Sequence, residues 1–160
     1  MLGRFHAACG VLSVLIGLWI LLSAKGTRLH VRMGWAYVAS MLCLNLSGFF
    51  IYHITGGFNL FHVVAIINLV LLAVGVAQVV YRARWRNWLW RHYQYMCWSY
   101  AALLAGASNE AFVHIPPLRR LKSETTNWLP LFAAVAIVVG AALVIARRQQ
   151  QMLERYGRPG

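Results

Sequence analysis

The sequence contains no aspartate, and only three of its 160 residues are acidic, namely Glu110, Glu124 and Glu154. Charged residues of both signs make up 11% of the chain, whereas soluble domains average about 25%. Such a chain has too few charges to cover a soluble surface. Because 61% of its residues are hydrophobic, it also lacks the composition of a disordered chain. The composition therefore excludes both a soluble globular domain and an intrinsically disordered protein.

Long apolar stretches, separated by short basic or glycine-rich segments, take up most of the chain. A helix needs about 20 mostly apolar residues to cross the hydrocarbon core of a membrane. The stretches do not alternate as barrel strands would, so we expect helices, which satisfy their backbone hydrogen bonds within each segment. The pattern predicts an all-α, multi-pass transmembrane helical bundle with five spans, a four-helix core plus a C-terminal anchor helix. The predicted spans are residues 7–24, 34–52, 62–81, 95–113 and 129–146 of a single bundle, 1–146, which a basic cytoplasmic tail, 147–160, follows.

The net charge of +12 comes from basic residues that lie between the apolar stretches. This placement indicates membrane topology and argues against nucleic acid as a partner. The positive-inside rule assigns the more basic connections to the cytoplasm, so we expect the N-terminus outside and the C-terminus inside a bacterial inner membrane. The inner side holds Lys25, Arg28, Arg32, Arg82, Arg84, Arg86, Arg91, Arg147, Arg148, Arg155 and Arg158, against Arg4, Arg119, Arg120 and Lys122 outside. The Trp- and Arg-rich segment 85–92 is typical of an interfacial belt.

Motifs of known chemistry are scarce. The three cysteines, Cys9, Cys43 and Cys97, have no redox or zinc-knuckle spacing and are interpreted as packing residues. The sequence also shows neither a phosphate-binding loop nor a nucleophile elbow. It does not decide whether the protein is an enzyme.

Polar side chains within the predicted spans indicate helix faces that point into the bundle, because contact with lipid is costly for them. In the fourth span they recur at three- and four-residue steps along one face. The second span has a similar stripe, and we expect Asn45 and Ser99 to form interhelical hydrogen bonds. The fifth span has no polar residue and is interpreted as an anchor against lipid. The stripes comprise His92, Met96, Ser99, Leu103, Gly106, Glu110 and His114 in the fourth span, His30, Gly34, Tyr37, Met41, Asn45, Gly48 and Tyr52 in the second, His62, Asn68, Gly75 and Gln78 in the third, and Gly10, Ser13 and Gly17 in the first.

The histidines form an outer and an inner group. The inner group is His30 and His92; the outer group is His6, His53, His62 and His114, with Glu110 as the only carboxylate within a predicted span. Along a helix, His92 and Glu110 are separated by about 27 Å. A single compact site therefore cannot include both groups.

Imidazole and carboxylate groups together are typical ligands of a divalent metal, with zinc as the default. We predict that His62, Glu110, His114 and His53 hold such a metal near the outer face. The alternative is a purely structural role, in which these residues cap helix ends and contact lipid headgroups or water. A haem between His62 and another outer histidine is less favoured. A further alternative is a proton or ion path between the two histidine groups, lined by Glu110, Ser99, Tyr100, Asn45 and Tyr37. The second polar group consists of His30, His92, Ser99, Tyr100, Asn45 and Tyr37.

Two further alternatives concern partners and redox chemistry. One alternative is a non-enzymatic membrane subunit, or a homo-oligomer, whose Trp/Arg belt and basic tail dock a membrane partner or an anionic lipid. It could instead be a haem- or quinone-linked redox protein, or an enzyme acting on a lipid or quinone. No nucleophile stands beside Glu110 in the sequence, which ranks the enzyme last.

Three motifs resemble a family of bacterial predicted membrane proteins, domain-of-unknown-function family 2306. They are Gly26–Met41, Gly56–His62 and His92–Tyr100, which Glu110 follows. The resemblance covers about residues 25–117 and implies a compact helical bundle in a membrane. It gives weight to the residues that match motif positions, which are His30, His62, His92, Ser99, Tyr100 and Glu110. It implies no biochemical activity.

Overall fold

The structure, a computed structural model, describes residues 1–51, 56–121 and 128–156. All regular secondary structure in these ranges is helical, which confirms the predicted all-α class. The chain divides into two compact units, Met1–Leu72 and Ala73–Gly160, and each is described by itself.

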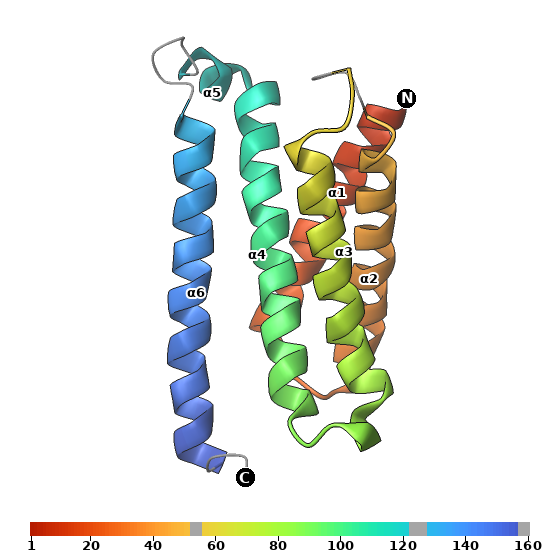
Figure 1. The fold of residues 1–160 in the computed structure, drawn as a ribbon, viewed down its shortest axis with the longest axis vertical. Helices are drawn as coiled ribbons and strands as arrows, with labels where there is room; N and C mark the ends of the chain where they lie inside the picture. The colour runs from red at the N-terminus through yellow and green to blue at the C-terminus, as the bar shows by residue number, and fades with distance from the viewer. Residues whose placement is uncertain (52–55, 122–127, 157–160) are drawn as a thin grey trace. The chain divides into compact units, whose positions relative to one another are not determined.

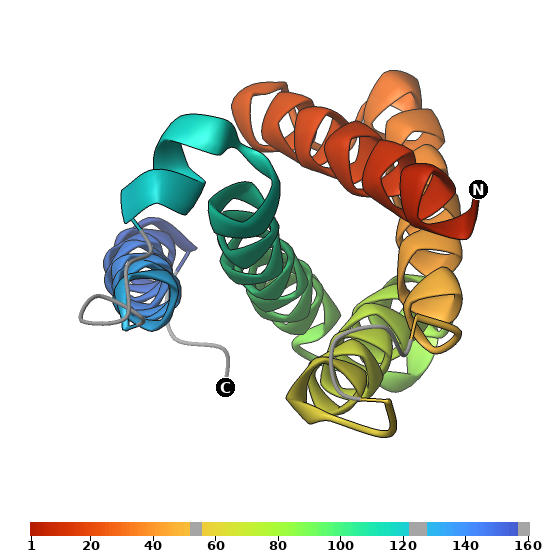
Figure 2. The same cartoon turned by 90° about the horizontal axis from the view of Figure 1, so that it is seen from above.

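The first unit begins with a helical hairpin. Helices α1 (Leu2–Leu22) and α2 (Arg28–Gly48) lie side by side (Figures 1 and 2). Lys25 ends α1, because its ammonium group donates hydrogen bonds to the carbonyl oxygens of the last turn. Gly26 then adopts a positive φ of 77°, which glycine accepts without steric cost. The hydroxyl of Thr27 accepts the backbone N–H of His30 at 3.0 Å and starts α2.

Two side-chain contacts join α1 to α2. The hydroxyl of Ser13 donates to Ser40 Oγ at 2.8 Å, and Ser40 in turn donates to the Tyr37 carbonyl at 3.0 Å. Nearer the start of α1, Nδ1 of His6 lies 3.0 Å from Ser47 Oγ. Ser13 and Ser40 are 0% and 7% exposed. Both hydroxyls are thus satisfied inside the hairpin, as buried polar groups must be.

Helix α3 (Leu60–Val80) begins in the first unit and ends in the second. Gly56, with a φ of 71°, precedes it. The side-chain oxygen of Asn59 accepts the backbone N–H of Phe61 at 2.9 Å, so Asn59 satisfies one of the free donors of the first turn. The polar face predicted for this helix is buried, since His62, Asn68 and Gln78 are at most 4% exposed.

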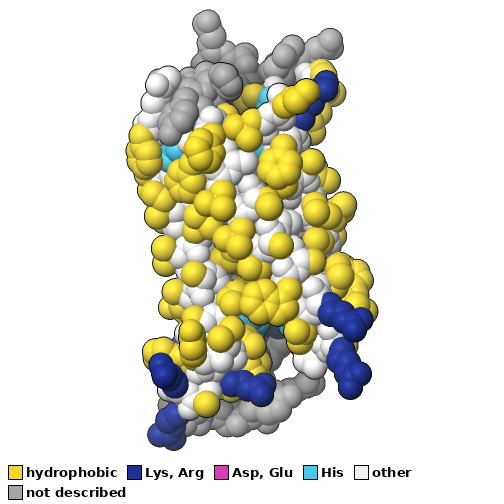
Figure 3. Space-filling model, turned by 90° about the vertical axis from the view of Figure 1, so that its right-hand side faces the viewer, with side chains coloured by type: hydrophobic (Ala, Val, Ile, Leu, Met, Phe, Trp, Pro, Cys, Tyr) yellow, Lys and Arg dark blue, Asp and Glu magenta, His cyan; other side chains and the backbone are white. Residues whose placement is uncertain are grey.

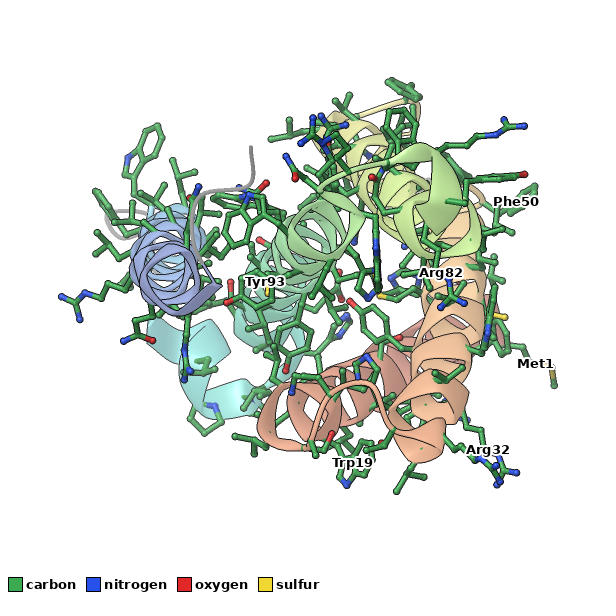
Figure 4. The ribbon with its side chains drawn as sticks, turned by 90° about the horizontal axis from the view of Figure 1, so that it is seen from below. Met1, Trp19, Arg32, Phe50, Arg82 and Tyr93 are labelled. Atoms are coloured by element: carbon green, nitrogen blue, oxygen red, sulfur yellow. The ribbon has the colours of Figure 1, made fainter. Side chains whose placement is uncertain are left out.

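The second unit continues with a short 3-10 helix, η1 (Arg82–Arg84), and with α4 (Trp88–His114), α5 (Pro116–Leu121) and α6 (Leu129–Tyr156). Helix α6 packs along α4 in antiparallel direction (Figures 1 and 2). The first turns of α4 therefore lie beside the last turns of α6. Figure 4 shows Tyr93 on the side of α4 that faces α6.

Three helical segments are long and apolar enough to cross a membrane: Leu2–Leu22, Leu60–Val80 and Leu129–Gln149. Helices α2 and α4 have the required length but not the composition, because both carry inward stripes of polar residues. Only three of the five predicted spans therefore have the composition of a membrane helix. Figure 3 shows one face with hydrophobic side chains across its middle and Lys and Arg side chains gathered toward its ends. This pattern suits a protein embedded in a bilayer.

Helix boundaries differ from the predicted spans where hydropathy is a poor guide. Helix α4 starts at Trp88 rather than residue 95, and α1 starts at Leu2 rather than residue 7. Helix α6 continues past residue 146 to Tyr156, since the Arg and Gln residues of its polar end are good helix formers. The sequence did not predict α5, which begins at Pro116. Proline is accepted there because the N–H groups of a first helical turn have no partner within the helix.

Candidate functional site

Glu110 and His114 form an ion pair at the end of α4. Glu110 Oε2 lies 3.1 Å from His114 Nε2, and the two side chains are 45% and 73% exposed. The four-residue step places both on one helix face. The sequence predicted this pairing from the spacing alone, and the structure brings the two groups together.

The separation of the two atoms is also that of neighbouring metal ligands. Tetrahedral zinc with bonds of about 2.0–2.1 Å holds adjacent nitrogen and oxygen ligands about 3.3 Å apart. A cation bound to both atoms would occupy the region between Glu110 and His114. The exposure of both side chains leaves room for further ligands. The pair can therefore serve as a hydrogen-bonded ion pair or as two ligands of a divalent cation.

His62 lies in a different setting, buried at the start of α3 with 3% exposure. Its ring stacks on Phe58 with centroids 5.1 Å apart, and Phe49 contacts it at 6.1 Å. Nδ1 of His62 is 3.2 Å from the backbone nitrogen of Asn59 and 3.1 Å from its Oδ1. These contacts fix the ring relative to the first turn of α3.

The two contacts of Nδ1 require opposite proton positions. If Asn59 N–H donates to Nδ1, the proton of a neutral His62 ring resides on Nε2, which then cannot bind a metal. If Nδ1–H donates to Asn59 Oδ1, then Nε2 carries the lone pair. Metal binding by His62 would thus select the second tautomer.

His92, near the start of α4, is fixed by one bond to α3. Its Nδ1 lies 2.8 Å from the carbonyl oxygen of Gly75 and must act as the donor, because a carbonyl only accepts. In the neutral ring Nε2 then carries the lone pair. A backbone bond of this kind also orients many metal-bound histidines. His92 therefore has the tautomer of a ligand, in a part of α4 distant from Glu110.

The remaining residues of the second polar group are mostly buried. Tyr37, Asn45, Ser99 and Tyr100 are at most 8% exposed, and His30 is half-buried. These positions confirm the predicted inward faces of α2 and α4. The amide of Asn45 donates to the Met41 carbonyl one turn earlier at 2.7 Å, whereas the sequence suggested that it would bond across helices. In α2 the interhelical bonds are made by Ser40 and Ser47 instead, at positions the stripe did not include.

The predicted four-ligand metal set is not assembled by the residues that the structure describes. Within 1–51, 56–121 and 128–156, no group of three or more His, Cys, Asp or Glu side chains is placed to hold a metal ion. His53 lies outside these residues. Of the predicted set, the structure brings together Glu110 and His114 only, and the roles of His62 and His53 stay predictions.

The sequence analysis treated the basic residues near the end of α6 as an orientation signal and, in one alternative, as part of a tail that docks a partner or an anionic lipid, without locating a site among them. In the structure, Arg147 and Arg148 line a surface hollow of about 320 Å³ together with Val144 and Gln151. The four-residue step from Val144 to Arg148 was the signal that could have located the hollow.

Comparison with known proteins supports the resemblance seen in the motifs. The chain matches the family described as "Predicted membrane protein (DUF2306)" over residues 3–153. The match is wider than the range of about 25–117 expected from the motifs, and it includes α1 and nearly all of α6. No curated protein and no solved structure matches the chain. With nearly its whole length matched, the protein belongs to the DUF2306 family of predicted membrane proteins.

Proposed function

We propose that this membrane protein binds a divalent cation, with zinc as the default, through Glu110 and His114. The observation that carries the proposal is the 3.1 Å separation of Glu110 Oε2 and His114 Nε2. A carboxylate oxygen and an imidazole nitrogen are both common zinc ligands, and their spacing suits one ion. The cation would lie between these two atoms.

The partial exposure of the pair supports this role. With 45% and 73% of the two side chains exposed, water can complete the coordination, and an ion can enter and leave. An exposed ion pair alone contributes little to stability, about 0–1 kcal/mol. Stability therefore gives little reason for a carboxylate within a predicted span, whereas a ligand role does.

The proposal includes the membrane topology. We infer five spans in a bacterial inner membrane with the N-terminus outside, which places Glu110 and His114 near the outer surface. The inference rests on the distribution of basic residues. Helices α2 and α4 would cross despite their polar stripes, because the polar side chains face protein. The 21 residues of α2 and the 27 of α4 are long enough for this.

The test is a zinc titration of metal-free protein in detergent by calorimetry. We expect saturable binding. The zinc affinity should fall at least about tenfold in Glu110→Gln and in His114→Gln, because loss of a residue that only hydrogen-bonds to a metal ligand already lowers metal affinity by this factor. Glu124→Gln and Glu154→Gln remove the same charge elsewhere and should bind as the wild type does. Equal binding by Glu110→Gln and wild type would disprove the proposal.

A further inference from the structure

A second site lies near the polar end of α6, and it does not depend on the proposed cation site. Val144, Arg147, Arg148 and Gln151 line a surface hollow of about 320 Å³. Arg147 and Arg148 are adjacent, and each lies three or four residues from both Val144 and Gln151, so the four residues share one helix face. The hollow has about ten times the volume of a water molecule in the liquid, about 30 Å³. It is large enough for a headgroup.

The lining of the hollow has the chemistry of an anion site. Arg147 and Arg148 present two guanidinium groups, which bind phosphate oxygens in bidentate fashion. The Gln151 amide adds a neutral donor. Among the side chains that the structure describes, those that line the hollow include no acidic one. An anionic occupant is favoured.

The position of the hollow along α6 indicates which anion would bind. The apolar run of α6 ends at Ala146, directly before Arg147. In a bilayer this change of composition would place Arg147, Arg148 and Gln151 at the depth of the headgroups. Phospholipid phosphates are found at this depth. Val144 lies one turn toward the hydrocarbon, where the first part of an acyl chain would contact it. The lining thus changes from apolar at Val144 to cationic at Arg147 and Arg148. A phospholipid beside it would place its acyl chain at the apolar end and its phosphate at the cationic end.

The neighbouring end of α4 has an interfacial composition as well. The Arg91 guanidinium lies 5.4 Å from the centroid of the Trp85 ring, and Trp90 and Tyr93 form a ring pair at 5.6 Å. Trp and Arg residues of this kind occur at headgroup depth in membrane proteins. Because α4 and α6 are antiparallel neighbours, both helices reach this depth at the same end of the unit (Figure 1).

From these observations we propose that Arg147, Arg148 and Gln151 form a binding site for the phosphate of an anionic phospholipid, with Val144 against its acyl chain. The orientation inferred from basic residues places the site in the cytoplasmic leaflet, where anionic lipids are concentrated. The site would fix α6 in the bilayer relative to the lipid rather than catalyse a reaction.

The test counts lipids bound to the full-length protein in detergent by native mass spectrometry, with phosphatidylglycerol and phosphatidylcholine as probes. We expect one phosphatidylglycerol per chain, bound at least about tenfold more strongly than phosphatidylcholine. In the double variant Arg147→Gln/Arg148→Gln this preference should disappear. Arg147→Lys/Arg148→Lys keeps the charge but not the bidentate geometry, and it should lose most of the preference while folding normally.

The matched control is Arg155→Gln/Arg158→Gln, which removes two charges from the tail. If general attraction of basic residues held the lipid, both double Gln variants would lose phosphatidylglycerol equally, and the proposal would be overturned. Inorganic phosphate provides the second control. If inorganic phosphate displaces the lipid when both are present at the same millimolar concentration, the occupant is free phosphate. That result also contradicts the proposal.

Discussion

Nδ1 of His92 donates a 2.8 Å hydrogen bond to the carbonyl oxygen of Gly75 and thereby joins α4 to the second half of α3. The contact depends on close approach of the two helices at a glycine. A Cβ atom added to Gly75 would lie 2.9 Å from Met96 Sδ and 3.2 Å from Tyr95 Cβ. The helix pair is therefore closest where the histidine is fixed.

We predict that Gly75→Ala destabilises the protein. The new methyl group can displace the flexible Met96 side chain but not the Cβ of Tyr95, and overpacking of this kind costs about 1–3 kcal/mol. A gain of about 0.5–1 kcal/mol from higher helix propensity offsets part of this. The net loss would be measured as a lower midpoint of unfolding in a denaturing detergent titration.

Gly106→Ala is the matched control, because nothing lies within 4 Å of a Cβ at that position of α4. It should leave the midpoint unchanged or raise it. Equal destabilisation by both substitutions would contradict the packing described for Gly75.

The Ser13–Ser40 bond predicts energetic coupling between α1 and α2. Each single alanine substitution should cost about 0.5–1.5 kcal/mol, since it removes a buried hydrogen bond. The double variant should cost less than the sum, by about 0.6 kcal/mol, a typical coupling between membrane helices. The measurement is a double-mutant cycle of unfolding free energies.

Ser108→Ala serves as the comparison for this cycle, because its hydroxyl bonds only within α4, to the Ala105 carbonyl at 2.8 Å. Combined with Ser13→Ala, it should give additive effects. Additivity of Ser13→Ala and Ser40→Ala instead would show that the hydroxyls do not interact.

Membrane topology predicts where reporter domains are active. A fluorescent protein fused at the C-terminus should fluoresce, because that end lies in the cytoplasm according to the positive-inside rule. Alkaline phosphatase fused after Gly57 should be active outside, and fused after Arg86 it should be inactive. A different pattern at Gly57 and Arg86 would show that α2 or α3 does not cross as proposed.

Zinc binding should weaken in acid. The His114 imidazole must be free of a proton on the ligating nitrogen, and the Glu110 carboxyl must be ionised, so protons compete with the metal. From about pH 7.5 to about pH 5.5 we expect the dissociation constant measured by calorimetry to rise at least about tenfold. Affinity that does not change with pH would exclude His114 as a ligand.

The sequence predicted the helices well because each apolar stretch reports directly on burial in lipid. It also predicted that Ser13, Tyr37, Asn45 and Ser99 face inward, since one helix period determines a face. It did not identify Ser40 and Ser47 as the partners of α1, because face periodicity does not determine which helix lies opposite. Hydropathy also misjudged the start of α4, where Trp88 and Arg91 are helical although they lie at the membrane interface.

Within the candidate site, the sequence predicted the Glu110–His114 pair because both residues lie on one helix with a four-residue step. It could not predict the environment of His62, which depends on ring contacts with Phe49 and Phe58 and on the cap made by Asn59. Such contacts arise from loop geometry rather than from helix periodicity. The hollow around Arg147 and Arg148 became apparent only in the structure, although its lining residues share one face of α6.

The central claim is that Glu110 and His114 bind a divalent cation, and the metal content of protein purified without chelator tests it most directly. Elemental analysis should find about one zinc or other divalent ion per chain in the wild type, as a single tetrahedral site requires. The Glu110→Gln and His114→Gln proteins should contain almost none, and a visible spectrum should show no haem band. Well-folded wild-type protein that holds no metal, or variants that hold as much as the wild type, would contradict the account.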